Sequence, residues 1–448
     1  MVGRERALEI VERAVAAVEA DGAEALLMVQ HDALTRFANS EIHQNVDVEG
    51  GTLRIRAVAG TREGWASVNQ FDDESIRQAA LRAREIAEVQ PENPDFPGLA
   101  DPSPYEDIEN YDEATAEASP EMRAEAVRRV ILQADAHGLN ASGSLRTRAS
   151  ELCIANSSGV SGYSRCTDAN LITVVLTDFT QDAGSGCSEA ASVRVGDINS
   201  EEVGRRAVEL CLATVNPGDV EPGEYDVVLA HSAVATCVGL LPMMGANGLA
   251  CSEGRSYASG RLGHKVTSEK VTIVDDWRNP ALPALPFDFE GTPRKAVRLI
   301  DKGIAAEVVY DRSAAKKEGI ASTGHGVPGV AGGYPLHLAM QPGDSSVDDM
   351  ITSIERGILV TRFNYTNPVH PVKTIITGMT KDGTFLIENG KVTRALRNLR
   401  FTDSMLGNVF GNIKSVSSDV KLFSAGVAFS IISVPAISAR LNFVGSTV

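Results

Sequence analysis

The stretch that most constrains the fold is YDVVLAHSAVATCVGLL, Tyr225 to Leu241, in which a short apolar run passes directly into a helical pattern. Residues 225–230 are too few and too apolar for an exposed helix, so we predict a buried strand there. Apolar residues then recur at helical spacing, and Ser232 is a favourable N-cap, which predicts a helix over 232–241. His231 falls at the junction, where a scaffold can hold a side chain beside a cleft.

This junction lacks the donor atoms of a zinc hydrolase helix. A HExxH helix supplies two imidazoles on one side and a carboxylate that handles the proton of a bound water. Here position 232 is serine, and no histidine occurs in the six residues after His231. Cys237 lies about 240° around the helix from His231, at roughly 100° per residue. We therefore expect no metal site in this helix, and we expect Cys237 to be a buried thiol rather than a nucleophile.

Composition excludes several functional classes. The 448 residues carry a net charge of −17 with no run of basic residues, which argues against nucleic acid or an anionic membrane as the main partner. The six cysteines form no CxxC pair, which is typical of free thiols in a reducing compartment. No apolar run approaches the roughly 18 residues of a membrane span, and the charged N-terminal helix does not resemble a signal peptide. We expect a cytoplasmic protein.

The periodicity predicts an α+β fold in two parts. Residues 1–218 read as an N-terminal α/β domain with helices on a mixed or antiparallel sheet, and the helix-then-strands pattern at the N-terminus repeats from Pro120. The proline-rich stretch 90–106 is a possible sub-boundary. Residues 219–448 read as a mainly β domain, a large antiparallel sheet or barrel-like structure that also carries the helix 232–241.

Local signals make more specific predictions. In one strand Leu53, Ile55 and Ala57 alternate with Arg54 and Arg56, which predicts one packed and one wet face. Further predictions are an N-cap at Ser200, a strand pair about Lys302-Gly303, a capping box from Ser346 to Asp349 in a helix closed by Gly357, hairpin turns at Asp382-Gly383 and Asn389-Gly390, and an edge or bulge position for Pro435.

The order of several phrases resembles the TldD/PmbA family, once called modulators of gyrase. They are LTRFANSEIHQ at 34–44, CSEGRSYASGRLGHKV at 251–266, VTIVDD at 271–276, PFDFEGTPRKAVRLIDKGI at 286–304, STGHG at 322–326 and GTFLIENGKV at 383–392. No single phrase is decisive, but their shared order covers essentially the whole chain.

The resemblance implies a two-subunit zinc peptidase. In that family a TldD-type chain carries HExxxH and a late cysteine ligand, and a TldE (PmbA) chain lacks them. Against that motif His231 falls on the first histidine, Ser232 on the glutamate and Thr236 on the second histidine, and no cysteine follows Cys251. The resemblance therefore implies a TldE-like subunit with no catalytic residue, metal or cofactor of its own. It also implies a TldD-like partner that holds zinc, and unfolded peptide as the substrate.

Candidate positions for lining a substrate chamber are His231, Ser232, Thr236, Glu253 and His325, each with an ordinary structural alternative. A histidine at a strand end is more often a structural hydrogen-bonding group, Thr236 suits plain packing, and acidic residues in turns are usually solvated. His325, in a glycine-rich loop, favours solvent exposure over peptide contact. Two other functions stay open: a stand-alone homodimeric hydrolase, and a peptide-binding regulatory protein that has lost the zinc site.

Overall fold

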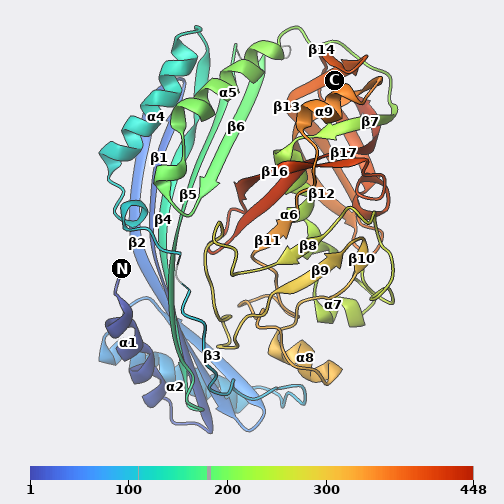
Figure 1. The fold of residues 1–448 in the computed structure, drawn as a ribbon. Helices are drawn as coiled ribbons and strands as arrows, with labels where there is room; N and C mark the ends of the chain where they lie inside the picture. Colours follow the sequence, from blue (N-terminus) through green and yellow to red (C-terminus); the bar gives the residue numbers. More distant parts are fainter. Residues whose placement is uncertain (109, 179–182, 447–448) are drawn as a thin grey trace.

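The computed structural model describes residues 1–108, 110–178 and 183–446. Its strands form two sheets that face each other across the molecule (Figure 1). The strands of the first sheet end at Ser192 and those of the second begin at Gly223. This arrangement confirms the α+β fold. Among the described residues, no helix combines the length and the apolar character needed to cross a bilayer.

The N-terminal half is built from one αβββα unit used twice. The first unit comprises α1 (Arg4–Ala16), β1 (Gly22–Ala38), β2 (Glu41–Ala59), β3 (Arg62–Val68) and α2 (Asp73–Val89). After the short α3 (Glu113–Ala116), the second comprises α4 (Pro120–Asp135), β4 (Asn140–Asn156), β5 (Ser161–Leu176), β6 (Ser185–Ser192) and α5 (Ser200–Ala213). The strand order β3-β2-β1-β4-β5-β6 places the two units side by side, and every neighbouring pair is antiparallel.

Side-chain caps fix where these helices begin. Asp72 accepts a hydrogen bond from the backbone N–H of Ser75 at the start of α2, and Ser119 accepts one from Met122 at the start of α4. The cap of α5 is Asn199, not Ser200 as the sequence suggested, because the Asn199 side chain reaches the N–H group at the third helical position. Ser200 is the first residue of the helix.

The helices cover one face of this sheet, and the other face looks toward the second half (Figure 1). Leu53, Ile55 and Ala57 pack against α1 and α2, as expected. The opposite face is not uniformly solvent-exposed, so the prediction made from the alternation of apolar residues with arginines is wrong for this face. Arg56 is only 4% exposed because the second half covers it, and it pairs with the fully buried Glu24 at 2.7 Å.

The C-terminal half begins with β7 (Gly223–Leu229) and α6 (His231–Gly239). It continues through α7 (Gly248–Ser252), β8 (Ile273–Asp275), β9 (Val297–Asp301), β10 (Ile304–Ala305), α8 (Arg312–Glu318), β11 (Leu338–Met340), α9 (Val347–Thr352), β12 (Arg356–His370), β13 (Ile375–Glu388), β14 (Lys391–Ala395), β15 (Leu399–Ser404), β16 (Ser415–Ser424) and β17 (Ile431–Ser446).

The sheet of this half closes on itself. Pairings run from β7 through β12, β13 and β15 to β17, and β17 pairs back onto β7, which confirms the barrel-like expectation. The sheet is mixed rather than purely antiparallel, because β7 with β12 and β11 with β17 are parallel pairs. The parallel β7–β12 pair follows from the long excursion of the chain between these strands. Pro435 lies in β17 opposite a bulge in β16, as its missing N–H group requires.

Two of the predicted turns form as expected. Lys302 and Gly303 join β9 to β10, and Asn389-Gly390 joins β13 to β14 with φ angles of 52° and 74°. The capping box of α9 is also present, since Ser346 and Asp349 bond each other's backbone N–H groups. Local sequence was sufficient here because the hydrogen bonds concerned span only a few residues.

Two other local predictions are wrong. Asp382-Gly383 is not a hairpin turn, because both residues lie inside β13, where they form a bulge opposite β12 with φ angles of 54° and 142°. Thr361 donates a hydrogen bond to the carbonyl of Gly383 and holds this bulge in place. Gly357 does not close the preceding helix. It lies in β12, five residues after the last residue of α9, and its Cβ position is occupied by the backbone of the adjacent β7.

The proline-rich segment 90–106 runs between the two halves and is held by both. Its Ala100 carbonyl accepts a hydrogen bond from Asn156 of β4, and its Leu99 carbonyl accepts one from Arg312 of α8. Tyr105 donates to the carbonyl of Gly291 at 2.7 Å. This segment therefore contributes to the contact between the halves instead of serving as a free linker.

A carboxyl pair, of which Asp288 is fully buried and Glu290 partly buried, lies in the same contact region and predicts a pH dependence of stability. Burial raises the pKa of Asp288, although the three backbone N–H bonds that it accepts, from Glu290, Thr292 and Gly326, favour its ionised form. Burial, and then the charge of Asp288, raises the pKa of Glu290. Glu290 therefore holds a proton in the native state at pH values where an unfolded glutamate, with a pKa of about 4.3, has lost it.

This raised pKa stabilises the fold at low pH, and the contribution is lost as the pH rises through the native pKa of Glu290. We expect the melting temperature of the wild type to fall more between pH 6 and pH 9 than that of Glu290→Gln, whose amide cannot ionise. Thermal denaturation of both proteins at the two pH values measures the difference. Equal pH dependence in the two proteins would contradict the assignment.

Candidate functional site

The helix α6 begins one residue earlier than the sequence suggested. Its N-cap is Ala230, with no side-chain cap, so Ser232 does not cap it and lies in the first turn. His231 is the first helical residue. Ala233, Val234, Cys237 and Val238 are buried in the main core of the C-terminal half, while Ser232 and Thr236, four residues apart, lie on a different side of the helix. The strand-to-helix junction therefore forms where the sequence placed it.

Ser232 and Thr236 line a groove between the two halves. Its cavity has a volume of about 280 Å³, and its walls come from α6, from Glu189 of β6, from the Tyr334-Pro335 segment and from the end of the β16–β17 hairpin. Apolar side chains make up much of these walls, among them Leu240, Leu338, Phe423 and Ile432. The groove is a mainly apolar slot with a few polar groups, a composition common in ligand sites.

Glu189 is the acidic residue of this groove, and sequence reasoning missed it. Its Oε1 accepts hydrogen bonds from Asn170 Nδ2 at 2.8 Å and from the backbone N–H of Ser424 at 3.3 Å. Burial raises its pKa, against these two bonds and the nearby Arg362, which lower it. No local pattern marks Glu189, because its position opposite α6 depends on how β6 meets the β16–β17 hairpin.

His231 does not line the groove. Its Nε2 lies 3.0 Å from Asp419 in β16, and burial lowers the pKa of its imidazole although Asp419 acts in the opposite sense. Thr236 Oγ1 donates to the carbonyl of Ser232 at 3.1 Å, so its hydroxyl bonds within the helix while its side chain faces the groove. Cys237 is fully buried, and burial raises the pKa of its thiol to about 12. A thiol of this kind is a poor nucleophile.

The remaining candidates lie away from the groove. Glu253 follows α7 at the surface and pairs with Arg255. His325 is fully buried, not solvent-exposed as its glycine-rich loop suggested, because its Nε2 bonds Asp275 at 3.0 Å and its Nδ1 lies 2.9 Å from Thr323 Oγ1. Burial raises the pKa of Asp275, but the neighbouring His325 and Arg294 outweigh this and lower it. These residues form a structural core of the loop region.

Among the other cavities that the described residues form, two are much larger than the groove. One of about 1030 Å³ lies on the concave face of the N-terminal sheet, along alternate residues of β1 such as Gln30, Asp32 and Leu34. It shares Ser424 with the groove beside α6, so the two spaces adjoin at the β16–β17 hairpin. Together they offer a wide entrance that leads to a narrower slot.

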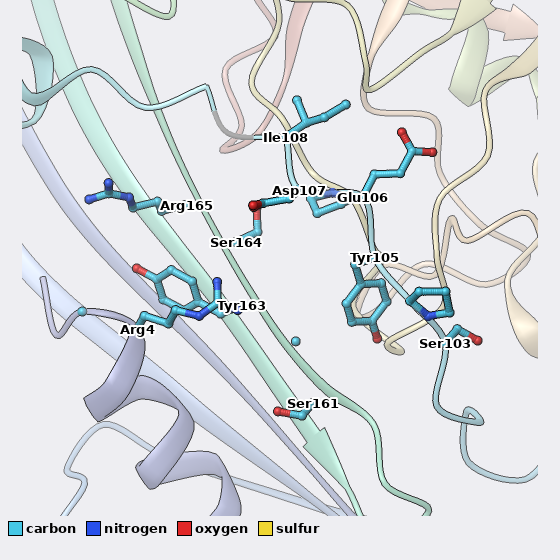
Figure 2. Close-up of a pocket in the computed structure, with 14 residues that line it drawn as sticks. Arg4, Ser103, Tyr105, Glu106, Asp107, Ile108, Ser161, Tyr163, Ser164 and Arg165 are labelled. Carbon is cyan, nitrogen blue, oxygen red and sulfur yellow. The ribbon is translucent and has the colours of Figure 1, made fainter.

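The other cavity, of about 710 Å³, lies between the start of α1, β5 and the segment 103–108 (Figure 2). The Arg4 guanidinium stands over the ring of Tyr163, 5.6 Å from its centroid, and Tyr163 donates a hydrogen bond to Glu151. Across the cavity the Glu106 side chain extends away and pairs with Arg278 (Figure 2). This cavity shares no lining residue with the groove and holds charges of both signs.

Comparison with known proteins places this layout in a family. Residues 222–442 match the model described as "PmbA/TldA metallopeptidase C-terminal domain", and residues 23–87 match "PmbA/TldA metallopeptidase domain 1". The fold and these matches define a metallopeptidase-related α+β protein. The chain belongs to the PmbA/TldD family.

Individual relatives agree with this assignment. The Metalloprotease PmbA of Escherichia coli O157:H7 is 24% identical, with 86% of this chain and 85% of that protein aligned. A Metalloprotease of Methanothermobacter thermautotrophicus is 25% identical over 51% of this chain, which spans only about half the length (50%) of that relative. The crystal structure of TldE from Thermococcus kodakarensis has the same fold, with a TM-score of 0.88 at 21% identity over 98% of this chain and 99% of that one.

A metallopeptidase family raises the question of whether the residues of α6 suit a zinc ion. Zinc sites in proteins are built from imidazole, thiolate and carboxylate donors. Of the three positions that the resemblance aligns with HExxxH, only His231 carries such a donor, and its Nε2 faces Asp419. Over the described ranges, no three His, Cys, Asp or Glu side chains gather in a way that could hold a metal ion. The donor set beside α6 does not fit zinc.

Proposed function

We propose that this chain is a TldE-like, non-zinc subunit of a cytoplasmic TldD/TldE-type metallopeptidase that acts on unfolded peptides. The observation that carries the proposal is the orientation of α6. The helix turns Ser232 and Thr236 toward an open groove, while its one imidazole is engaged with Asp419. The groove can therefore hold a ligand, but Ser232, Thr236 and His231 provide neither a set of metal ligands nor an activated nucleophile.

The shape of the site supports a role in holding peptide. A cavity of about 280 Å³ is slightly smaller than typical ligand pockets, which span roughly 300–1,000 Å³, so it suits side chains of an extended segment rather than a folded domain. The adjoining cavity of about 1030 Å³ on the concave sheet gives room for the rest of the segment. In this proposal a TldD-like partner supplies the zinc-activated water that cleaves the peptide.

Co-purification with a TldD-like chain tests this proposal. We expect the isolated chain to bind no stoichiometric zinc and to cleave no unfolded peptide, and we expect the mixed complex to do both, with zinc in the partner. Metal analysis of each subunit and a casein-peptide cleavage assay give the two readouts. Zinc or cleavage in the isolated chain would favour a stand-alone hydrolase. Failure to form any complex would favour a peptide-binding regulatory protein.

A groove-filling substitution adds a sharper prediction. Thr236→Trp places a large ring in the slot, so we expect peptide cleavage by the complex to fall at least tenfold while the two chains still co-elute. Thr402→Trp, at a surface position of β15, is the control and should leave cleavage unchanged. Unchanged cleavage in Thr236→Trp would show that substrate does not use this groove.

A further inference from the structure

We propose that the groove beside α6 selects peptides that carry a primary ammonium group, with Glu189 as the residue that binds it. The ammonium can belong to the amino terminus of the peptide or to a lysine side chain. This inference rests on the proposed peptide-holding function and adds a chemical preference to it.

The first argument is the way Glu189 is held. Asn170 and the backbone N–H of Ser424 both donate to Oε1, one from the N-terminal sheet and one from the β16–β17 hairpin. Within the described part of the chain, Oε2 accepts no hydrogen bond, and Glu189 lines the groove. One oxygen therefore anchors the carboxylate and the other stays available for a ligand. A carboxylate oriented by its neighbours in this way is preorganised for binding.

The second argument is the charge around Glu189. Arg362 is a cation whose charge acts on Glu189 and lowers its pKa. Arg362 is already occupied, however, because it pairs with Asp382 at 3.3 Å and donates a hydrogen bond to Cys187 Sγ at 2.7 Å. Glu189, Arg362 and Asp382 together leave one uncompensated negative charge. A partly buried carboxylate without its own cation is unfavourable unless a partner of opposite charge arrives. An ammonium group supplies that charge and can donate a charge-assisted hydrogen bond to Oε2.

The third argument is the composition of the walls. Leu240, Leu338, Phe423 and Ile432 form apolar surfaces along the slot that leads from Glu189 past α6. Such surfaces suit the methylene stem of lysine or the first side chain of a peptide, whose charged end then reaches the carboxylate. The net charge of −17 also attracts cationic peptides at long range and disfavours acidic ones.

Three fluorescent peptides of one length test the inference by anisotropy. The first has a free amino terminus and no lysine, the second is acetylated and has one lysine, and the third is acetylated with norleucine in place of that lysine. The protein is used both as the isolated full chain and as the complex with a TldD-like partner after its metal has been chelated. The first two peptides separate the two sources of the ammonium group.

We expect at least one ammonium peptide to bind about ten- to hundredfold more tightly than the norleucine peptide, the range expected for a hydrogen bond to a charged group. Glu189→Gln keeps the shape and can still accept the bonds from Asn170 and Ser424, so it should fold but lose this preference. Glu202→Gln, at the exposed first turn of α5, is the matched control and should keep it.

The outcomes distinguish the two proposals. Equal binding of all three peptides, or a preference that survives Glu189→Gln, would overturn the ammonium inference and leave the peptide-holding function standing. Absence of binding by every peptide in both preparations would overturn the proposed function and the inference with it.

Discussion

Replacing Arg56 with methionine should lower the free energy of unfolding by about 3–5 kcal/mol, the range measured when one partner of a buried ion pair is removed. Arg56 Nη2 lies 2.7 Å from Glu24 Oε1, and Nη1 lies 3.0 Å from Glu63 Oε2. Glu24 is fully buried, and burial raises its pKa even beside Arg56. Without the guanidinium, Glu24 must either keep an uncompensated charge in the contact between the halves or take up a proton.

Two comparison variants make this prediction specific. Arg54→Met changes the next residue on the same face of β2, where the guanidinium is half-buried over Trp65 at 4.8 Å, and should cost about 1 kcal/mol or less. The double variant E24L/R56M removes both charges and should recover much of the loss. Denaturant unfolding of the wild type, the single variants Arg54→Met, Arg56→Met and Glu24→Leu, and the double variant supplies the free energies. A double variant as unstable as the sum of its single changes would contradict the ion-pair account.

Adding one methyl group at Gly64 or at Gly186 should cost about 1–3 kcal/mol at each position, as overpacking of a tight contact does. A Cβ at Gly64 of β3 would lie 2.0 Å from the carbonyl oxygen of Ala83 in α2. A Cβ at Gly186 of β6 would lie 2.1 Å from the carbonyl oxygen of Ala207 in α5. Both obstacles are backbone atoms of a helix, so rotating a side chain cannot relieve the clash and the helix must shift.

The two glycines occupy equivalent places in the two αβββα units, at opposite edges of the sheet. We therefore expect Gly64→Ala and Gly186→Ala to lower the melting temperature by similar amounts. Gly196→Ala is the control, because no heavy atom lies within 4 Å of its Cβ position and its φ is not in the left-handed region; it should change stability by no more than about 0.5 kcal/mol. A neutral Gly64→Ala would show that α2 does not rest on β3 as closely as described.

Sequence reasoning found the elements of this fold but assigned one face of the first sheet wrongly. The alternation about Leu53 and Ile55 correctly gave the side that packs on α1 and α2. It took the Arg56 side as wet, because charged residues at every second position normally mark a solvent face. Whether that face meets water depends on the second half of the chain, which begins more than 150 residues later and covers Arg56 but leaves Gln30 beside an open cavity.

The candidate site, like the first sheet, could be predicted from the sequence only in part. The junction at His231 could be predicted from a buried strand followed by a helical pattern, and Ser232 and Thr236 line a groove next to it. The place of Glu189 in the groove could not be predicted, because Glu189 comes from a strand of the other half and lies in no recognisable sequence motif. His325 was assigned to an exposed loop because glycines surround it in the sequence. In the structure its side chain is fully buried and bonds Asp275.

The sequence by itself determined the features whose energetics span a few residues: the repeated αβββα order, the capping box at Ser346 and the Asn389-Gly390 hairpin. Tertiary structure alone decided that Asp382-Gly383 is a bulge and that Glu189 faces α6. The physical reason is that turns and caps depend on bonds between near neighbours in the chain. Burial, strand register and the walls of the groove depend instead on contacts between segments that are far apart in the sequence and that exclude water where they meet.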